Sequence, residues 1–514
     1  MAERGQSANL TSSTSGTSRR SVVQQAAAIW TFGTCPWALA RGTMPCTTPT
    51  DASAPPLGAA DVRRFGARGD GRSDDTAAIQ RALDSLEPGQ TLVFPPGIYL
   101  HSSRLVVANA GARLWGYGAT LHATSPADQA LLIQASNARV LGFTMTAVTD
   151  ERRHAPWESR IAIWRHGNDL PALTDVEVRD NRIIESGPPG SARANSSSSA
   201  AIFIHNVHRF VVSGNVVRRS LSDGIHITGG ARHGLVEGNT VRETGDDMVA
   251  VVSYLGRGEP GVETPALIAR ELARRKDQEL VRNVLISDND VSGQYWGRGI
   301  SVVGGEDVSI IGNLIDATTH GAGVYIAREQ GWNTFGVRNV RVEGNKITRV
   351  QTTRPAYSVL PMAQRLHTAG HAAVEIVAHI FEDEKRIAEL RDALTVRRVR
   401  VQNNLIEDVS TVGVRVGYGW NRQLAQAQSR ADGSRYTRRF GGASISEISL
   451  IGNRFNAVNA GLEILNAQDS EAAFEAADNR LEGRPMEAST GSSRPFGGSI
   501  TGASVVGCKP QLGR

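Results

Sequence analysis

A short motif of alternating apolar and polar residues that ends in asparagine recurs along this chain. It appears as Val176-Glu-Val-Arg-Asp-Asn181 and as Val308-Ser-Ile-Ile-Gly-Asn313, with a further apolar residue two positions after each asparagine. The motif places asparagine at positions 181, 215, 239, 289, 313, 345, 404, 453 and 479. Alternation with a period of two indicates half-buried strands. Short strands at a recurring interval predict an all-β solenoid, a right-handed parallel β-helix in which neighbouring turns bury one another's apolar face.

The motif asparagines have a structural explanation. Two of the intervals between them are 24 residues, and the longer ones are expected where loops are inserted into a constant core. We expect each asparagine to adopt the left-handed backbone conformation at a sharp bend, with its amide bonded to the asparagine of the next turn. These residues are therefore not candidates for the functional site.

Length and composition agree with one elongated domain. The repeat runs through most of the 514 residues, and the 54 glycines suit a coil with many tight turns. The formal net charge is +5, but only four of the 56 basic residues are lysine. This arginine bias does not indicate a nucleic-acid interface. After the N-terminus no run of 18 apolar residues occurs, so a membrane span is not expected. We expect a monomer.

The first 40 residues are typical of an export signal. Arg19 and Arg20 precede an apolar stretch, and Ala38-Leu-Ala40 provides small residues for cleavage. This arrangement resembles a bacterial twin-arginine signal peptide and predicts a periplasmic or extracellular protein. The alternative is a Ser/Thr-rich leader without an export role. Cleavage would leave Cys46 and Cys508, whose pairing the sequence does not decide.

The predicted signal is followed by a linker over 41–58, a β-helix over 59–485 with an insertion at 254–280, and a tail over 486–514. At its start, Ser73 or Asp74 can cap a short helix that would cover the open first turn of the coil. The apolar stripe of this helix consists of Ile79, Ala82, Leu83 and Leu86.

This N-terminal stretch resembles the signature of the pectate-lyase-like superfamily, which includes polygalacturonases, rhamnogalacturonases and phage tailspikes. The residues concerned run from Val62 through Phe65-Gly-Ala and Gly69-Asp-Gly to Phe94-Pro-Pro-Gly. In that superfamily the segment caps the coil, so the resemblance assigns Asp74 and Asp75 a structural role.

Charged residues occupy one position of the repeat on three successive turns. Asp223 and Asp247 are 24 residues apart, each eight residues after a motif asparagine, and Asp246 lies beside them. Aligning the turns gives the same position to Arg298. Other turns carry Ala200, Ala322, Ala372 and Val412 there. Carboxylates on neighbouring strands about 4.8 Å apart repel one another, which favours a functional role. The alternative is that each aspartate closes an Asx turn with its own backbone.

The same stretches resemble the polygalacturonase family of glycoside hydrolases. Asp223-Gly-Ile matches its first motif, Gly245-Asp-Asp247 its second, and Gly297-Arg-Gly-Ile its third with arginine in place of histidine. The fourth motif retains only its frame at Gly323-Val-Tyr325 and lacks the Arg-Ile-Lys residues. The resemblance implies that Asp246 is a general acid and that Asp223 and Asp247 hold the attacking water. We expect Arg298, Tyr325, Tyr254 and Trp296 to bind a polysaccharide substrate, and no cofactor or metal is needed.

Two other interpretations stay open. In pectate lyases, aspartates bind calcium and an arginine removes a proton, so Asp223, Asp246, Asp247 and Arg298 also fit a lyase or epimerase. A non-catalytic glycan-binding β-helix would need only the N-terminal cap. The missing fourth motif makes plain pectin doubtful as substrate, and the sequence identifies no other sugar.

Overall fold

In the computed structural model, the chain divides into two units, Met1–Ser53 and Ala54–Arg514. All described residues belong to the second unit, so the predicted signal peptide and most of the predicted linker lie outside them. The structure describes residues 55–125, 128–147, 155–165, 170–185, 200–255, 266, 269–270, 272–273, 279–294, 296–353, 370–381, 387–417, 426–429, 435–438, 440–442, 445–464, 474–485, 489–491 and 504–506.

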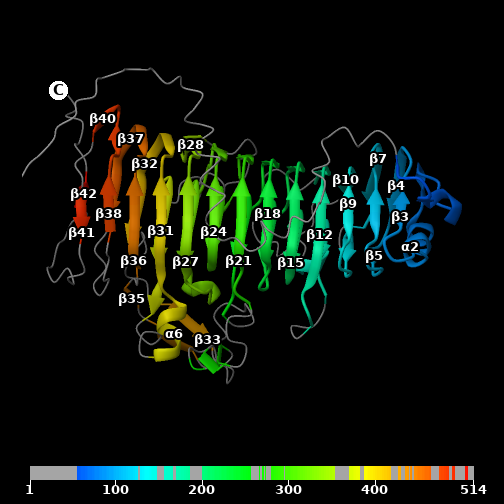
Figure 1. Ribbon diagram of the computed structural model, residues 1–514, viewed down its shortest axis with the longest axis horizontal. Coiled ribbons are helices and arrows are strands. Elements are labelled where there is room, and N and C mark those ends of the chain that lie inside the picture. Colours follow the sequence, from blue (N-terminus) through cyan, green and yellow to red (C-terminus); the bar gives the residue numbers. More distant parts are fainter. Residues whose placement is uncertain are drawn as a thin grey trace, which may run out of the picture. The chain divides into compact units, whose positions relative to one another are not determined.

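The second unit is a right-handed parallel β-helix, which confirms the predicted fold. Each turn contributes a strand to each of three rows, and Figure 1 shows successive strands side by side in chain order. We call these rows A, B and C. The strands of row A are β1 (Ala60–Asp61), β3 (Thr91–Val93), β6 (Arg113–Trp115), β9 (Arg139–Leu141), β12 (Leu173–Arg179), β15 (Val207–Ser213), β18 (Arg232–Glu237), β21 (Arg282–Ser287), β24 (Gly305–Ile311), β27 (Val337–Glu343), β31 (Val396–Gln402), β36 (Ile445–Ile451), β38 (Phe474–Ala477) and antiparallel β41 (Ser489–Gly491).

Rows B and C form one sheet because the long strands β32 (Leu405–Gly417) and β37 (Arg454–Ile464) run through both. The other strands of row B are β2 (Asp70–Asp74), β4 (Gly97–His101), β7 (Ala119–Ala123), β10 (Thr144–Ala147), β13 (Arg182–Ile184), β16 (Val216–Arg218), β19 (Thr240–Arg242), β22 (Asp290–Ser292), β25 (Leu314–Asp316), β28 (Lys346–Val350), β39 (Arg480–Leu481) and β40 (Arg484–Pro485). Those of row C are β5 (Leu105–Val107), β8 (Leu131–Ile133), β11 (Ile161–Ile163), β14 (Ile202–His205), β17 (Ile225–Thr228), β20 (Val249–Val252), β23 (Ile300–Val303), β26 (Val324–Arg328), β29 (Val374–Ala378) and antiparallel β42 (Ser504–Val506).

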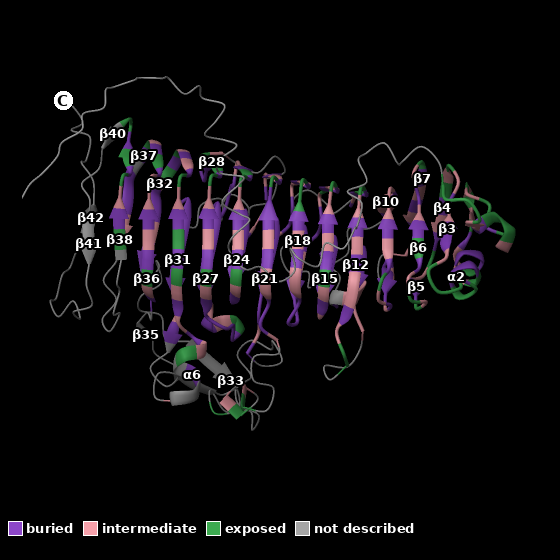
Figure 2. Ribbon diagram, in the orientation of Figure 1, coloured by how far each residue is buried: buried purple, intermediate pink, exposed green. Residues whose placement is uncertain are grey.

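The core is a continuous stack of aliphatic side chains that point inward from all three rows. One turn contributes Val236 from row A, Val241 from row B and Val249 and Val251 from row C, all fully buried. Figure 2 shows buried residues in strand after strand along the β-helix. Because each turn has only a few inward positions, its apolar face is covered only by the turns on either side.

The motif asparagines form an uninterrupted ladder, as predicted. The Nδ2 atom of Asn215 donates to Oδ1 of Asn239 at 2.9 Å, and that of Asn239 donates to Oδ1 of Asn289 at 2.9 Å. The pattern continues through all nine residues to Asn479. Each amide both donates and accepts, so every buried polar atom of the side chain is used.

The predicted left-handed conformation of these asparagines is wrong. The residue before each asparagine has the positive φ instead, for example Gly214 (64°), Asp288 (55°) and Asn403 (56°). Glycine, aspartate and asparagine tolerate that conformation best. The ladder residue itself keeps an ordinary backbone, and its N–H donates to the Oδ1 of the next asparagine.

The predicted N-terminal helix is α2 (Thr76–Asp84), which lies at the N-terminal end of the β-helix in Figure 1. Its residues Ile79, Ala82 and Leu83 are buried, as is Leu86 just beyond it. Its N-cap position is Asp75, one residue later than predicted, and this carboxylate does not cap the helix. It accepts from the backbone N–H groups of Arg68 (2.7 Å) and Gly69 (3.0 Å) and so fixes the preceding loop.

The remaining described elements are short and lie outside the three rows. They are η3 (Val62–Phe65), η4 (Pro156–Glu158), η6 (Gln330–Trp332), α6 (Ala388–Ala393), β30 (Ile380–Phe381), β33 (Gln426–Ser429), β34 (Arg435–Arg438) and β35 (Phe440–Gly442). Of the insertion predicted at 254–280, few residues are described, and Ala269 and Leu272 among them pack against the core. Among the described helices, none has the length and apolar character needed to cross a membrane.

Candidate active site

The aspartates singled out by their spacing lie where row B turns into row C. Ile225 of β17 pairs with Val249 of β20. Asp223 and Asp247, each two residues earlier, therefore occupy equivalent positions on adjacent turns. The backbone N–H of Gly224 donates to the carbonyl of Asp247 at 3.0 Å, and that of Met248 donates to the carbonyl of Arg298 at 3.0 Å. The three charged residues therefore occupy one column on adjacent turns, as the sequence alignment predicted.

Asp246 joins the two aspartates of the column to form a cluster of three. A carboxylate oxygen from each lies within 4.8 Å of one from each of the others. Gly297, on the next turn, has a φ of +69°, and a Cβ there would lie 2.2 Å from Oδ1 of Asp246 and 2.5 Å from Oδ1 of Asp247. The glycine thus lets the backbone of one turn approach the carboxylates of its neighbour.

Asp247 is held firmly by its hydrogen bonds. Its Oδ1 accepts from the backbone N–H of Arg298 at 2.6 Å, and its Oδ2 accepts from Oγ of Ser301 at 2.5 Å. The Nη1 of Arg298 lies 3.7 Å from Oδ1 of Asp247. In the described part of the chain, by contrast, no group donates a hydrogen bond to the carboxyl of Asp246. Asp246 as a whole residue is partly exposed.

Arg298 has partners on every side. Its Nη2 donates to Oε1 of Glu329, a residue that follows β26 immediately. Its guanidinium carbon lies 4.1 Å from the centre of the Tyr325 ring, which is a cation–π distance. The arginine therefore connects Asp247 to Glu329 and rests on a buried tyrosine.

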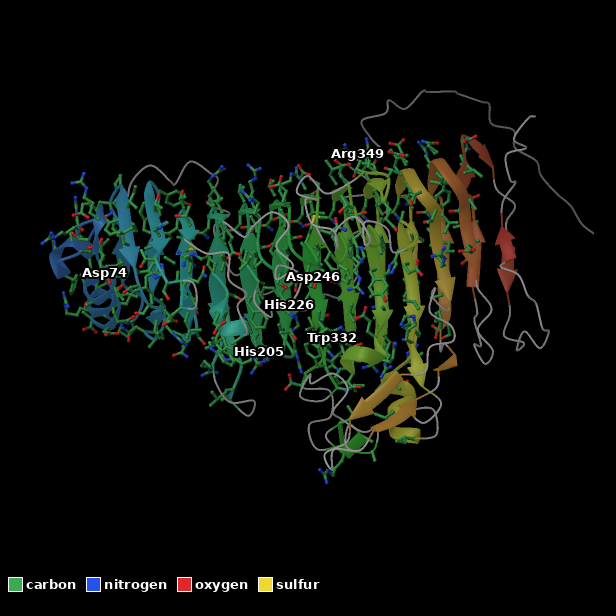
Figure 3. The ribbon with its side chains drawn as sticks, turned by 180° about the vertical axis from the view of Figure 1, so that it is seen from behind. Asp74, His205, His226, Asp246, Trp332 and Arg349 are labelled. Atoms are coloured by element: carbon green, nitrogen blue, oxygen red, sulfur yellow. The ribbon has the colours of Figure 1, made fainter. Side chains whose placement is uncertain are left out.

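Asp223 is bonded to a histidine of β17, the strand that follows it, and this histidine belongs to a series of rings. Nδ1 of His226 lies 2.5 Å from Oδ2 of Asp223. The imidazole stacks on Phe203 of the preceding turn, with ring centres 5.1 Å apart and planes at 13°. Further rings follow toward the N-terminus, because Trp164 contacts both Phe203 and His205. Figure 3 shows Asp246, His226 and His205 following one another on this face.

The surroundings of Asp246 and Asp247 shift their pKa values by different amounts. Burial raises the pKa of Asp246 well above its ordinary value of 3.8, and the neighbouring charges of Asp247 and Asp223 raise it further. Burial also raises the pKa of Asp247, to about 6, although the Arg298 guanidinium acts in the opposite direction. Of the two carboxyls, Asp246 is therefore the one expected to hold a proton more tightly.

The predicted substrate-binding residues have different surroundings. Tyr325 is only 3% exposed, so it supports Arg298 from below rather than lining an open surface. Tyr254 is half-buried and forms an isolated bridge with Thr334. Trp296 is also half-buried and stacks on His320, with ring centres 4.3 Å apart. Of the four predicted residues, Arg298 is thus the one that contacts the aspartate cluster directly.

Sequence reasoning missed three partners of the cluster, namely His226, Ser301 and Glu329. Ser301 and His226 occupy equivalent positions of row C, since the register pairs each of them with Ala250 of β20. A correctly phased strand alignment could have found both. Glu329 lies beyond the end of a strand, and no repeat signal marks it.

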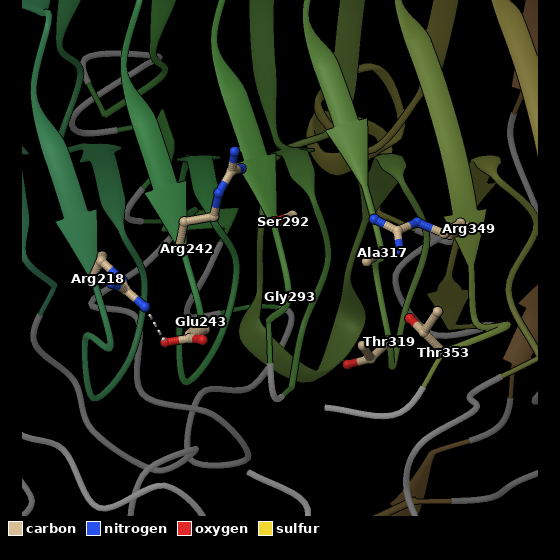
Figure 4. A pocket seen from close by; sticks show the side chains of 9 residues that line it. All are labelled: Arg218, Arg242, Glu243, Ser292, Gly293, Ala317, Thr319, Arg349 and Thr353. Atoms are coloured by element: carbon tan, nitrogen blue, oxygen red, sulfur yellow. Dashed lines mark hydrogen bonds and ion pairs between the residues drawn. The ribbon is translucent and has the colours of Figure 1, made fainter. Parts of the chain in front are cut away.

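A hollow lies beside row B, on turns that also carry the aspartate cluster. It has a volume of about 460 Å³ and is lined by Arg218, Arg242, Glu243, Ser292, Gly293, Ala317, Thr319, Arg349 and Thr353 (Figure 4). Its arginines pair with Glu243, Asp290 and Asp316. Neither the aspartate cluster nor its partners line this hollow.

Comparison with known proteins places the fold. A family model described as rhamnogalacturonase A/epimerase, pectate lyase-like, matches residues 59–154. No curated protein matches the chain. Among solved structures, the catalytic unit of a thermostable GH87 alpha-1,3-glucanase from Streptomyces thermodiastaticus strain HF3-3 is 15% identical, with a TM-score of 0.54, over 86% of this chain and 72% of that one.

Two further structures show a similar extent of overlap. The Agl-KA catalytic domain is 14% identical, with a TM-score of 0.50, over 84% of this chain and 69% of that one. The A-module of mannuronan C-5 epimerase AlgE6 from Azotobacter vinelandii is 16% identical, with a TM-score of 0.48, over 82% of this chain and 99% of that one.

These matches define the class of protein. The chain has the parallel β-helix fold of these structures, and residues 59–154 match a pectate lyase-like family model, in agreement with the resemblance noted at the N-terminus. Within the pectate-lyase-like superfamily, the matched segment is similar to the rhamnogalacturonase A/epimerase family.

Proposed function

We propose that this protein is a glycoside hydrolase that cleaves a polysaccharide with Asp246 as general acid and Asp223 and Asp247 as the residues that hold and activate water. The observation that carries the proposal is the contrast inside the cluster. Asp246 has a raised pKa and a carboxyl that accepts no hydrogen bond from the described residues, whereas both oxygens of Asp247 accept hydrogen bonds. Glycoside hydrolysis needs one protonated and one ionised carboxyl on either side of the scissile bond.

Each residue then has a defined task. The proton of Asp246 passes to the glycosidic oxygen as the bond to the anomeric carbon breaks, so that the leaving sugar departs as an alcohol. A water held by Asp223 and Asp247 gives its proton to a carboxylate and its oxygen to the anomeric carbon. His226 fixes the carboxylate of Asp223, and Ser301 fixes that of Asp247.

We expect inversion at the anomeric carbon, although the carboxylates are closer than the roughly 6.5–9.5 Å common in inverting enzymes. Both oxygens of Asp247 accept hydrogen bonds, which lowers its nucleophilicity and suits it to binding water. NMR of the first sugar released tests this expectation. Initial formation of the retained anomer would instead assign a covalent role to one aspartate.

A second candidate function follows from the closeness of the three carboxylates. Three carboxylate oxygens within 4.8 Å of one another fit the preference of calcium for oxygen ligands, and Asp223, Asp246 and Asp247 would hold the ion. A cation there would stabilise negative charge on a uronate, as a lyase or epimerase requires. Against this candidate, Arg298 is paired with Glu329 and is not free to act as a base.

One assay separates these candidates. The purified protein is incubated with a panel of polysaccharides, with and without calcium, and both new reducing ends and ultraviolet absorbance are followed. Reducing ends without an unsaturated product support the hydrolase. An absorbing unsaturated product that depends on calcium would replace it by a lyase, and exchange of solvent hydrogen into an uncleaved polymer would replace it by an epimerase.

We also propose that the protein acts outside the cytoplasm. The support is the twin-arginine pattern at Arg19 and Arg20, in residues that the structure does not describe. Replacing both arginines by lysine should retain the protein in the cytoplasm, as cell fractionation would show. Unchanged export of the double variant would contradict this proposal.

A further inference from the structure

Among the described residues, the arginine that pairs with the aspartate cluster already has carboxylate partners within the protein. Arg298 binds Glu329 through Nη2, lies 3.7 Å from Asp247 through Nη1 and covers Tyr325 with its face. A substrate carboxylate on the remaining N–H groups would share the charge of this guanidinium with Glu329 and Asp247, and one on Nη2 would have to displace Glu329. Such a displacement would leave a partly buried carboxylate without its partner, which is costly.

The charges around the cluster are mostly negative. The carboxylates of Asp247 and Glu329 lie beside the guanidinium of Arg298, and the carboxylate of Asp223 is bonded to His226. Within the described residues, no lysine or second arginine forms an ion pair with any of the three aspartates. A uronate ring placed over the cluster would therefore bring a fourth negative group into a region that is already repulsive.

On the neighbouring turns of row C, the positive charge of Arg415 is paired as well. Toward the C-terminus, Arg415 lies between two carboxylates, with Nη1 at 3.1 Å from Glu375 and Nε at 2.5 Å from Glu463. Toward the N-terminus, the partly exposed ring of Trp164 packs against the buried ring of Phe203. A partly exposed indole suits the apolar C–H faces of sugars.

One exposed aromatic residue adds to this surface. The indole of Trp332 is 50% exposed, although tryptophan is usually buried. It lies in η6, three residues after Glu329, so the pairing of Arg298 with Glu329 places Trp332 in the neighbourhood of the cluster (Figure 3). The apolar surface there is available to a sugar ring but carries no charge to attract an acidic one.

We propose that the sugar bound across the aspartate cluster is uncharged and that the site discriminates against uronates, so that the substrate is a neutral polysaccharide. This inference rests on the proposed hydrolase function, whose site it uses. The Arg298–Glu329 pair is the specificity element, because Glu329 neutralises the positive charge that would otherwise attract a substrate carboxylate.

The test uses polymers that differ only in charge. Polygalacturonan and alginate are each compared with their carboxyl-reduced derivatives, together with neutral glucans and galactans of several linkages. We expect kcat/KM for any cleaved neutral polymer to exceed that for an acidic one by at least about 100-fold, as expected for juxtaposed like charges. Faster cleavage of an acidic polymer than of its carboxyl-reduced form would overturn the inference.

A binding experiment keeps this inference separate from the proposed chemistry. Affinity electrophoresis of the full-length protein in gels that contain these polymers requires no turnover. Retardation by neutral but not acidic polymers, without release of reducing ends, would contradict the hydrolase and support the charge preference. Retardation by acidic polymers alone would overturn the charge preference whether or not cleavage occurs.

The specificity element can be tested directly by Glu329→Gln. This substitution removes one negative charge and frees Arg298, so the ratio of acidic to neutral polymer affinity should rise about tenfold. The matched control is Glu237→Gln, which neutralises an exposed carboxylate at the end of β18 in row A. An unchanged ratio in a folded Glu329→Gln protein, or an equal rise in the control, would contradict the role given to the pair.

Discussion

Two columns of polar side chains run along the same β-helix, and they differ in chemistry. The asparagine ladder joins row A to row B and repeats one residue type nine times, each amide bonded to the next. The aspartate column lies between rows B and C and, among the described residues, carries charge on three turns. At the equivalent position, the turns that follow it hold Ala322, Ala372 and Val412, which are buried.

The difference shows which polar groups a stack of strands can repeat without cost. A primary amide donates and accepts, so identical amides satisfy one another at the spacing of adjacent strands. Ionised carboxylates only accept, so two of them side by side repel and raise each other's pKa. The uniform asparagine ladder therefore stabilises the β-helix. The aspartate column, whose residues change from turn to turn, indicates a role other than stabilisation.

The largest effect is expected from replacing one member of the charged column by an amide. Asp246→Asn keeps the size of the side chain but removes the transferable proton, so we expect kcat to fall by about 10²-fold or more. Asp307→Asn, on the exposed side of row A, is the control and should leave kcat unchanged. Turnover by Asp246→Asn at the wild-type rate would contradict the role of Asp246 as general acid and leave it at most a role in substrate binding.

The reverse exchange should damage the ladder. Asn404→Asp places a carboxylate between Asn345 and Asn453 and removes the Nδ2 donor that binds Asn453 at 3.0 Å. Burying an unpaired charge in this way should lower the free energy of unfolding by about 3 kcal/mol or more. Chemical denaturation measures it, with Asn403→Asp as control, because other turns carry aspartate naturally at that exposed position. An equal decrease in the free energy of unfolding in both variants would show that the ladder hydrogen bonds contribute no more to stability than the exposed neighbouring position.

A smaller effect should follow from weakening one support of the column. Ser301→Ala removes the hydroxyl that donates to Asp247 at 2.5 Å and stabilises its ionised form. The pKa of Asp247, about 6 in the wild type, should therefore rise, and the acidic limb of the activity profile should move to higher pH by about half a unit to one unit. A shift to lower pH would mean that Asp247 acts in its protonated form.

The smallest effect concerns stability and pH. The pKa of Asp246 lies above 3.8 in the folded state, so between 3.8 and that raised pKa the folded protein binds a proton that the unfolded chain has released. Its stability therefore falls as pH rises from 3.8 toward the raised pKa. Asp246→Asn should thus raise the melting temperature at neutral pH, corresponding to about 1 kcal/mol, and the gain should disappear below pH 3.8. Calorimetry at several pH values tests this. A lower melting temperature at neutral pH would instead support a structural Asx turn.

The sequence predicts whatever depends on the repeat. The spacing of Asp223, Asp247 and Arg298 from the asparagines fixed their common level, because parallel register carries a sequence offset into space. It could not place Glu329 or Trp332, which follow β26 in a connection without periodicity. It also assigned the positive φ to the wrong residue at each bend, since asparagine and its neighbour are both compatible with that conformation.

The corner that carries the ladder has a constant length. In every turn from β12 to β39, two residues separate the row A strand from the row B strand, for example Gly214 and Asn215 between β15 and β16. The intervals between successive ladder asparagines nevertheless vary from 24 to 59 residues. All variation in length is therefore absorbed by the other two corners. For protein engineering, this makes those corners the sites at which loops could be exchanged to retarget the site, while an insertion at the ladder corner would put every later turn out of phase.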